Sequence, residues 1–236
     1  MKILIGVALA CAVSAQTTPP PEAVQPQQDK LAYGVLPNYR TAESSVPFSP
    51  LTAKQKITIG WKDTVNVPAY VTAGIFSGIA QINNTNPSFG QGFGGYAHRY
   101  ATAVADQDLG NMLTEGFIPS LLHEDPRFFR KGTGGAWSRV GYAASRVLVT
   151  RTDKGNWRFN TSEFLGNATV ASIGNLYYPD GRTVGDTAQR MFTQIGTDAL
   201  SNVLKEFWPD VKRWRANKNA RKNAPAVVGQ ALSPAR

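Results

Sequence analysis

The fold is decided by residues 94–132, which read GGYAHRYATAVADQDLGNMLTEGFIPSLLHEDPRFFRKG. The stretch from Tyr96 to about Phe117 predicts one long helix. Pro119 should break it, because proline lacks a backbone N–H and its ring clashes with the preceding turn. Residues 121–132 then gather ionisable and aromatic side chains. We therefore expect these residues to form a turn at one end of a helical bundle.

Two helices are predicted before this stretch. Thr52 and Gln55 match a capping box, in which each side chain bonds the backbone N–H of the other residue. Pro68 interrupts the first helix near Val67. A second, uncharged helix is expected to run from Ala69 to about Ile82.

Three helices are predicted after it, each with a turn or capping signal. Between the first and the second, residues 157–160 are expected to be an extended lead-in rather than a strand. The three helices cover about 136–149, then 163–177 capped by Ser162, then 183–209, where Pro209 should stop or bend the last one.

We find no run of alternating strands, so the sequence predicts an all-α fold, a single compact bundle of five to six helices. Small residues four positions apart would let two helix backbones approach closely. This spacing fits both tight packing in an ordinary bundle and contact of a helix face with a bilayer. Three pairs have it: Gly74 with Gly78, Gly141 with Ser145, and Ala168 with Ser172.

Composition divides the chain into four parts. Residues 1–15 have the positive, apolar and small-residue regions of a signal peptide, so we expect export to a bacterial periplasm or outer envelope. Anchoring as a lipoprotein through Cys11, the sole cysteine, is the alternative. Residues 16–50 are a Pro/Gln-rich tether and irregular lead-in, 51–209 the helical domain, and 210–236 a basic, disordered tail.

The net charge of +9 is concentrated in that tail. In an exported protein the available polyanions are lipid head groups and wall polymers, so we expect an anionic membrane or cell-wall surface as partner and no nucleic acid. A solvated tail without a partner is the alternative. The basic residues proposed to bind such a surface are Lys212, Arg213, Arg215, Lys218, Arg221 and Lys222.

A second group of charges follows helical spacing. Asp108 and Glu115 lie seven residues apart on the long helix, and Arg139 and Arg146 have the same spacing on the next helix. Because an arginine can bind a carboxylate through two hydrogen bonds, the two pairs could meet across an antiparallel contact. The alternative is that both are ordinary solvated faces.

Candidate catalytic residues lie in the turn after Pro119. The candidates are His123, Glu124, Asp125 and His98. They include the only two histidines of the chain, and such side chains are suited to acid–base catalysis. In the alternative structural interpretation, Arg127 and Arg130 pair with nearby carboxylates and two phenylalanines close the end of the bundle. The spacing matches no compact metal-ligand motif, and we expect no metal site and no cofactor.

Two segments resemble a family of exported bacterial proteins of unknown function. They are HEDPRFFRKG at 123–132 and SNVLKEFWPD at 201–210. The resemblance extends over most of residues 35–213. It implies export and a single domain, and it supplies no activity, cofactor or catalytic residue.

The sequence therefore predicts a non-catalytic helical envelope protein associated with a membrane or cell-wall surface. The alternative is a hydrolase with a site at residues 123–125. The oligomeric state is left open.

Overall fold

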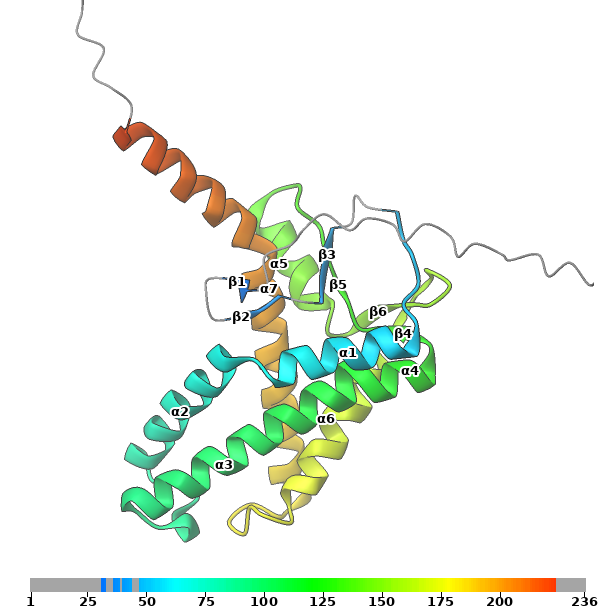
Figure 1. The fold of residues 1–236 in the computed structure, drawn as a ribbon. Coiled ribbons are helices and arrows are strands. Elements are labelled where there is room, and N and C mark those ends of the chain that lie inside the picture. The colour runs from blue at the N-terminus through cyan, green and yellow to red at the C-terminus, as the bar shows by residue number, and fades with distance from the viewer. Residues whose placement is uncertain (1–30, 33–35, 39, 44–46, 224–236) are drawn as a thin grey trace, which may run out of the picture.

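The computed structural model describes residues 31–32, 36–38, 40–43 and 47–223. The predicted signal peptide, Cys11 and the last part of the basic tail lie outside these residues. Within them the expected mostly helical, compact bundle is confirmed (Figure 1).

The first two helices begin where the sequence predicts. Helix α1 spans Ala53–Thr64 and is opened by a capping box, in which Thr52 N donates to Gln55 Oε1 at 2.8 Å. Helix α2 spans Val67–Ile82, with a proline in its first turn. The two helices are bent by 49° at the break, which is the interruption expected of Pro68.

The long central helix continues past the residues where we expected a break. Helix α3, Gly92–Asn111, follows a short 3₁₀ turn η1, Pro87–Phe89, and leads into a π-helical turn η2, Met112–Phe117. Helix α4, Ile118–Leu122, contains Pro119 in its first turn and ends where His123 adopts a left-handed φ of 55°. Ile118 N, just before the proline, donates to Leu113 O across the π-helical turn, so the rod continues although Pro119 itself has no N–H to donate.

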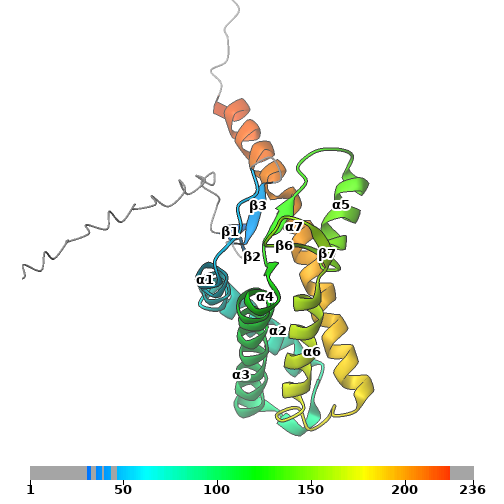
Figure 2. The same cartoon turned by 90° about the vertical axis from the view of Figure 1, so that its right-hand side faces the viewer.

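Three helices complete the bundle. They are α5, Ala136–Ser145, α6, Thr161–Gly174, and α7, Val184–Asn223. Helix α6 is capped by Asn160, whose Oδ1 accepts from Glu163 N at 3.2 Å, and not by Ser162 as predicted. Figures 1 and 2 show α6 beside α7 and α1 crossing the C-terminal part of the α3–α4 rod.

The basic segment after Pro209 differs from the prediction. Helix α7 runs through Pro209 to Asn223, so residues 210–223 are helical rather than a disordered tail. The helix extends beyond the body of the bundle in Figure 1. Its exposed basic residues are thereby held on a rigid element.

Short strands close one end of the bundle. β3, Thr41–Glu43, pairs in parallel with β5, Phe128–Arg130, and β1, Leu31–Ala32, pairs with β2, Leu36–Pro37. β6, Val149–Thr152, lies between β4, Glu124–Asp125, and β7, Trp157–Phe159. Residues 157–159 are thus a strand, contrary to the prediction. The lead-in before residue 51 also contributes to the core, because Arg40 and Ala42 are buried.

Small residues do mediate close helix contacts, although mostly not at the predicted pairs. A Cβ on Gly60 would lie 3.0 Å from Asn111 O, and one on Gly166 would lie 2.6 Å from Thr114 Cγ2. Of the predicted positions, Gly74 faces Tyr96, whereas nothing lies within 4 Å of a Cβ placed on Gly141. The close approaches therefore join η2 to α1 and α6.

Candidate functional site: an apolar face over a charged interior

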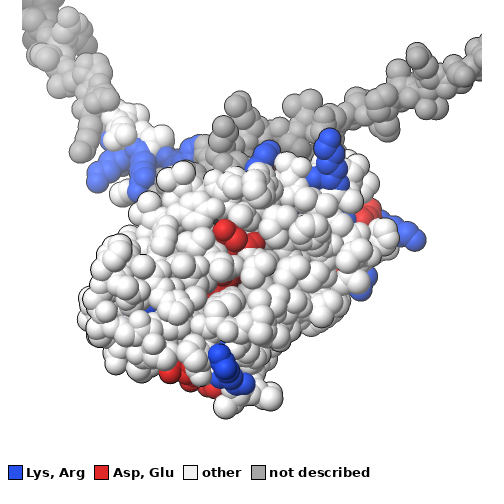
Figure 3. Space-filling view, turned by 60° about the horizontal axis from the view of Figure 1, so that its bottom comes forward, with Lys and Arg blue, Asp and Glu red and all other residues white. Residues whose placement is uncertain are grey.

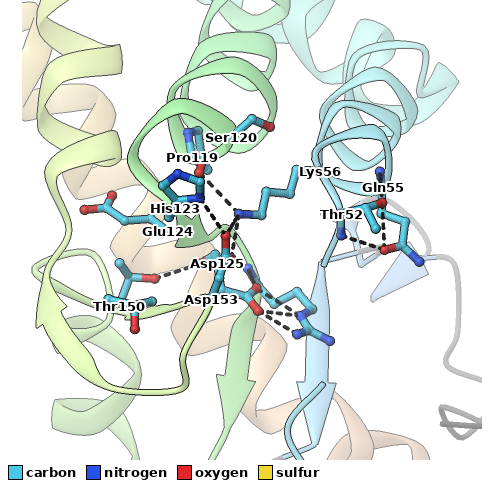
Figure 4. Close-up of polar contacts among 12 residues, drawn as sticks. Thr52, Gln55, Lys56, Pro119, Ser120, His123, Glu124, Asp125, Thr150 and Asp153 are labelled. Carbon is cyan, nitrogen blue, oxygen red and sulfur yellow. Dashed lines mark hydrogen bonds and ion pairs between the residues drawn. The ribbon is translucent and has the colours of Figure 1, made fainter. Parts of the chain in front are cut away.

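The His123 turn is a structural junction rather than an open cleft (Figure 4). The His123 side chain is 82% exposed, and its Nδ1 lies 3.5 Å from Asp153 Oδ2. The same Asp153 accepts a 2.6 Å hydrogen bond from Lys56 Nζ, which is buried between α1 and α4. Lys56 also donates to Pro119 O at 3.3 Å. These contacts tie α1 to the turn.

The two acidic residues of this turn are buried and paired with neighbouring side chains. Glu124 Oε2 accepts hydrogen bonds from Ser162 N at 2.8 Å and from Ser162 Oγ at 2.5 Å. Its Oε1 lies 3.1 Å from Arg158 Nε. The Asp125 carboxylate binds the backbone and guanidinium of Arg127 at 2.6–3.1 Å. Both carboxylates are 1% exposed, so neither faces a substrate cleft.

His98 does not join these residues. It lies near the start of α3, stacked on Phe89 with ring centroids 3.8 Å apart. His123 follows α4 at the other end of the same rod, on the order of 35 Å away at the usual helical rise. The four proposed catalytic residues therefore do not converge, and the contacts match the structural interpretation. Arg130 pairs with Glu43 at 2.6 Å, as that interpretation also predicts.

The predicted ion pairs between two helix faces are replaced by other pairs. Arg139 binds Glu206 Oε1 at 2.8 Å and Asp210 at 2.6 Å, both on α7. Arg146 stacks on Tyr142 and Trp157, and Asp108 Oδ1 is buried without a hydrogen bond in the described structure. The predicted spacing thus identified residues that matter for packing and mispaired them.

Glu115 pairs with Arg40, which lies in the segment before α1. Its Oε1 lies 3.1 Å from Arg40 Nη1, and both side chains are buried. The π-helical turn places this carboxylate in the centre of the bundle. Asp198 of α7 lies 3.9 Å from Arg40. Such turns recur at functional sites, and here one positions a buried charge.

This pair belongs to a cluster that we call the charged interior: Arg40, Asp63, Glu115, Glu163, Asp198 and Lys205. Burial, followed by Asp63, raises the pKa of Glu115 well above its usual value in spite of Arg40. Burial and Asp198 do the same to the pKa of Glu163. Burial and the charge of Arg40 lower the pKa of Lys205 to about 8. The acidic and basic side chains of the charged interior therefore shift one another's pKa values in a space with little water.

A separate cleft of about 450 Å³ lies between α3, α6 and α7. Asp106 Oδ2 accepts a 2.7 Å hydrogen bond from Tyr178, and Oδ1 accepts one from Tyr177. Burial raises the pKa of Asp106. The cleft can hold water or a small polar molecule, but it contains no nucleophile beside a base. Within the described residues no cluster of three or more His, Cys, Asp or Glu could hold a metal ion.

The outer surface of α2 is apolar, in contrast to the polar cleft and the charged interior. Large apolar side chains 46–85% exposed recur along one stripe, while Ala69, Ala73 and Ser77 face inward and are at most 7% exposed. The helix has no charged residue. We call this stripe the α2 face: Val67, Val71, Ile75, Phe76, Ile79 and Ile82.

Figure 3 shows one face of the molecule. Uncharged side chains cover most of the surface in view, Lys and Arg stand at its upper, right-hand and lower edges, and Asp and Glu show near its centre and at its lower edge. At the C-terminal end of α7, Lys212, Arg213, Arg215, Lys218 and Arg221 are all exposed, whereas the side chain of Lys222 lies outside the described structure. Trp214 is 61% exposed beside Lys218, whose Nζ is 5.0 Å from the indole centroid.

No family model, curated protein or solved structure matches the chain. Among the described residues no single helix is both long and apolar enough to cross a bilayer. The bent α1–α2 pair passes that test when the two helices are taken together.

Proposed function

We propose that this protein is a non-catalytic, exported envelope protein that attaches to the surface of a lipid bilayer through the α2 face. The observation that carries the proposal is the inversion of α2, which turns alanine and serine inward and Val, Ile and Phe outward. Such a helix gains free energy only when another apolar phase covers its outer side.

A bilayer is the occupant favoured by the chemistry of the rest of the molecule. Charged side chains such as Lys56, Glu124 and Glu206 are among its most deeply buried. Charges turned inward and apolar side chains turned outward are typical of helices in contact with lipid. Trp61 is 56% exposed near the end of α1, where an indole suits the boundary between head groups and acyl chains.

The basic end of α7 supplies the second contact. In Figure 1 it projects at the upper left of the molecule, and α2 lies at the lower left. Each lysine or arginine near an anionic lipid surface contributes about 1 kcal/mol. The apolar face and this basic end together form the two-part attachment typical of proteins that lie on a membrane.

Flotation of the full chain with phospholipid vesicles tests the proposal. The protein should float with the vesicles at both 0.1 M and about 1 M salt, since apolar contacts persist when charges are screened. A second copy of the chain is the other possible occupant of the α2 face. Concentration-dependent dimerisation together with recovery of the whole protein below the vesicles would contradict lipid attachment.

A further inference from the structure

The two arginines of the described β-rich end that form no ion pair lie beside each other. In this region Arg127 pairs with Asp125, Arg130 with Glu43, and Arg158 with Glu124. Arg146 and Arg151 have no carboxylate partner among the described residues. Their Nε atoms are buried and make no hydrogen bond there. Within the described part of the chain, two positive charges are thus left without a counter-charge.

Aromatic rings hold these two side chains in place. Each guanidinium carbon lies 4.6 Å from the ring centroid of Trp157, so the two carbons cannot be farther apart than twice that distance. Arg146 also covers Tyr142, and Arg151 covers Phe129. Stacking holds the two guanidinium groups against the rings, while their Nε atoms keep no hydrogen-bond partner among the described residues.

The charges around Arg146 indicate which kind of ligand would fit between the two arginines. Burial, together with the charge of Arg151, lowers the pKa of Arg146 even though Tyr142 opposes the shift. Arg146 Nη2 donates a 3.1 Å hydrogen bond to Ser145 Oγ. An anion seated between the two side chains would relieve the repulsion and accept the unused N–H groups.

We propose that Arg146, Arg151 and Trp157 form a binding site for a phosphate group. A single arginine fork already occupies both oxygens of a carboxylate, whereas a tetrahedral phosphate offers further oxygens to a second arginine. Trp157 and Phe159 lie two residues apart on the same side of β7 and are 44% and 55% exposed. Their rings would cover the organic part of a phosphate monoester.

The test is isothermal titration of the full chain with inorganic phosphate and with phenyl phosphate, at ionic strength matched with sodium chloride. Both should bind saturably, the phenyl ester more tightly. Arg146→Gln and Arg151→Gln should each weaken binding about tenfold or more. Arg182→Gln, which removes the same charge from an exposed position, should leave binding unchanged.

Further arms separate the sources of the phosphate and guard against unfolding. If the two substitutions weaken binding only to vesicles that contain phosphatidic acid, the phosphate group belongs to a lipid head group. If soluble phosphates respond, the ligand is a soluble ester. Arg151→Lys keeps the charge without the fork and should bind more weakly while its helical circular dichroism stays native. Equal binding by the wild type, Arg146→Gln and Arg151→Gln, both to the soluble phosphates and to phosphatidic acid vesicles, would overturn the proposal.

Discussion

Arg40 lies 3.1 Å from Glu115, and this ion pair fastens the segment before α1 to the π-helical turn at the centre of the bundle. The two side chains are 10% and 4% exposed. Burial alone would lower the pKa of Arg40, but Glu115 and Asp198 more than offset it and raise that pKa above its usual value. The arginine is therefore a fixed positive charge among buried carboxylates.

Removing this charge should destabilise the fold. Arg40→Ala leaves the Glu115 carboxyl buried without its nearest polar partner, which costs about 1–3 kcal/mol. Urea unfolding at pH 8 measures the change. Arg182→Ala, at an exposed position, should change the free energy of unfolding by less than about 0.5 kcal/mol. A loss below about 1 kcal/mol for Arg40→Ala would contradict a stabilising role.

The raised pKa of Glu115 predicts how stability changes with pH. Because the native carboxyl holds its proton at pH values where the unfolded chain has released it, this contribution is complete below about pH 4.5 and is lost as pH rises toward the native pKa. Glu115→Gln keeps a neutral side chain at every pH, so its stability should fall less steeply over that range. Urea unfolding at several pH values between about 4.5 and 8 compares the slopes. Identical slopes would contradict the raised pKa.

Local signals predicted the helices well. The capping box at Thr52, the break at Pro68 and the start of the last helix at Thr183 each act through neighbours in the sequence, and the structure has all three. Of the two outcomes predicted for Pro209, the stop does not occur, because its fixed φ is compatible with a helix whose packing overrides the missing hydrogen bond. The fate of a mid-helix proline depends on tertiary contacts that one sequence does not display.

The long-range partners were beyond the reach of sequence patterns. Spacing predicted that Glu115 and Arg139 could pair across a helix contact, but their partners Arg40 and Glu206 come from distant segments. The short strand at 157–159 exists only because β6 lies beside it. The uncharged Ala69–Ile82 stretch was the available signal for the α2 face, although the sequence could not say which side of that helix faces outward.

Replacing two glycines by alanine should have opposite effects on stability, because only one of them packs closely against η2. Gly166→Ala places a methyl group 2.6 Å from Thr114 Cγ2 and 3.3 Å from its backbone, which should cost about 1–3 kcal/mol. Gly196→Ala lies within α7 with nothing within 4 Å of the new Cβ, and should stabilise by about 0.5–1 kcal/mol. Thermal and urea unfolding distinguish them. Equal effects of the two substitutions would refute this packing.

The basic end of α7 should act only on charged membranes. Replacing Arg215, Lys218 and Arg221 by glutamine removes about 1 kcal/mol per residue, and so up to about 100-fold in partitioning onto anionic vesicles at low salt. The difference should vanish at about 1 M salt and on neutral vesicles. A loss of the same size on neutral vesicles would show that the substitutions act through folding.

The α2 face should dominate attachment to neutral lipid. Ile75 and Ile79 lie four residues apart on its stripe and are 61% and 46% exposed, so replacing both by aspartate alters the outer surface without touching the core. Each isoleucine covered by lipid contributes about 1.5–3 kcal/mol. Trp137, 87% exposed on α5, provides the matched control.

The most direct measurement is flotation of three proteins with neutral phospholipid vesicles at about 1 M salt, where the basic end of α7 is screened. The proteins are the wild type, Ile75→Asp/Ile79→Asp and Trp137→Asp, each checked for native helical circular dichroism. The wild type and Trp137→Asp should float with the vesicles, and the α2 variant should stay at the bottom of the gradient. Flotation of the α2 variant together with the wild type would contradict attachment through α2.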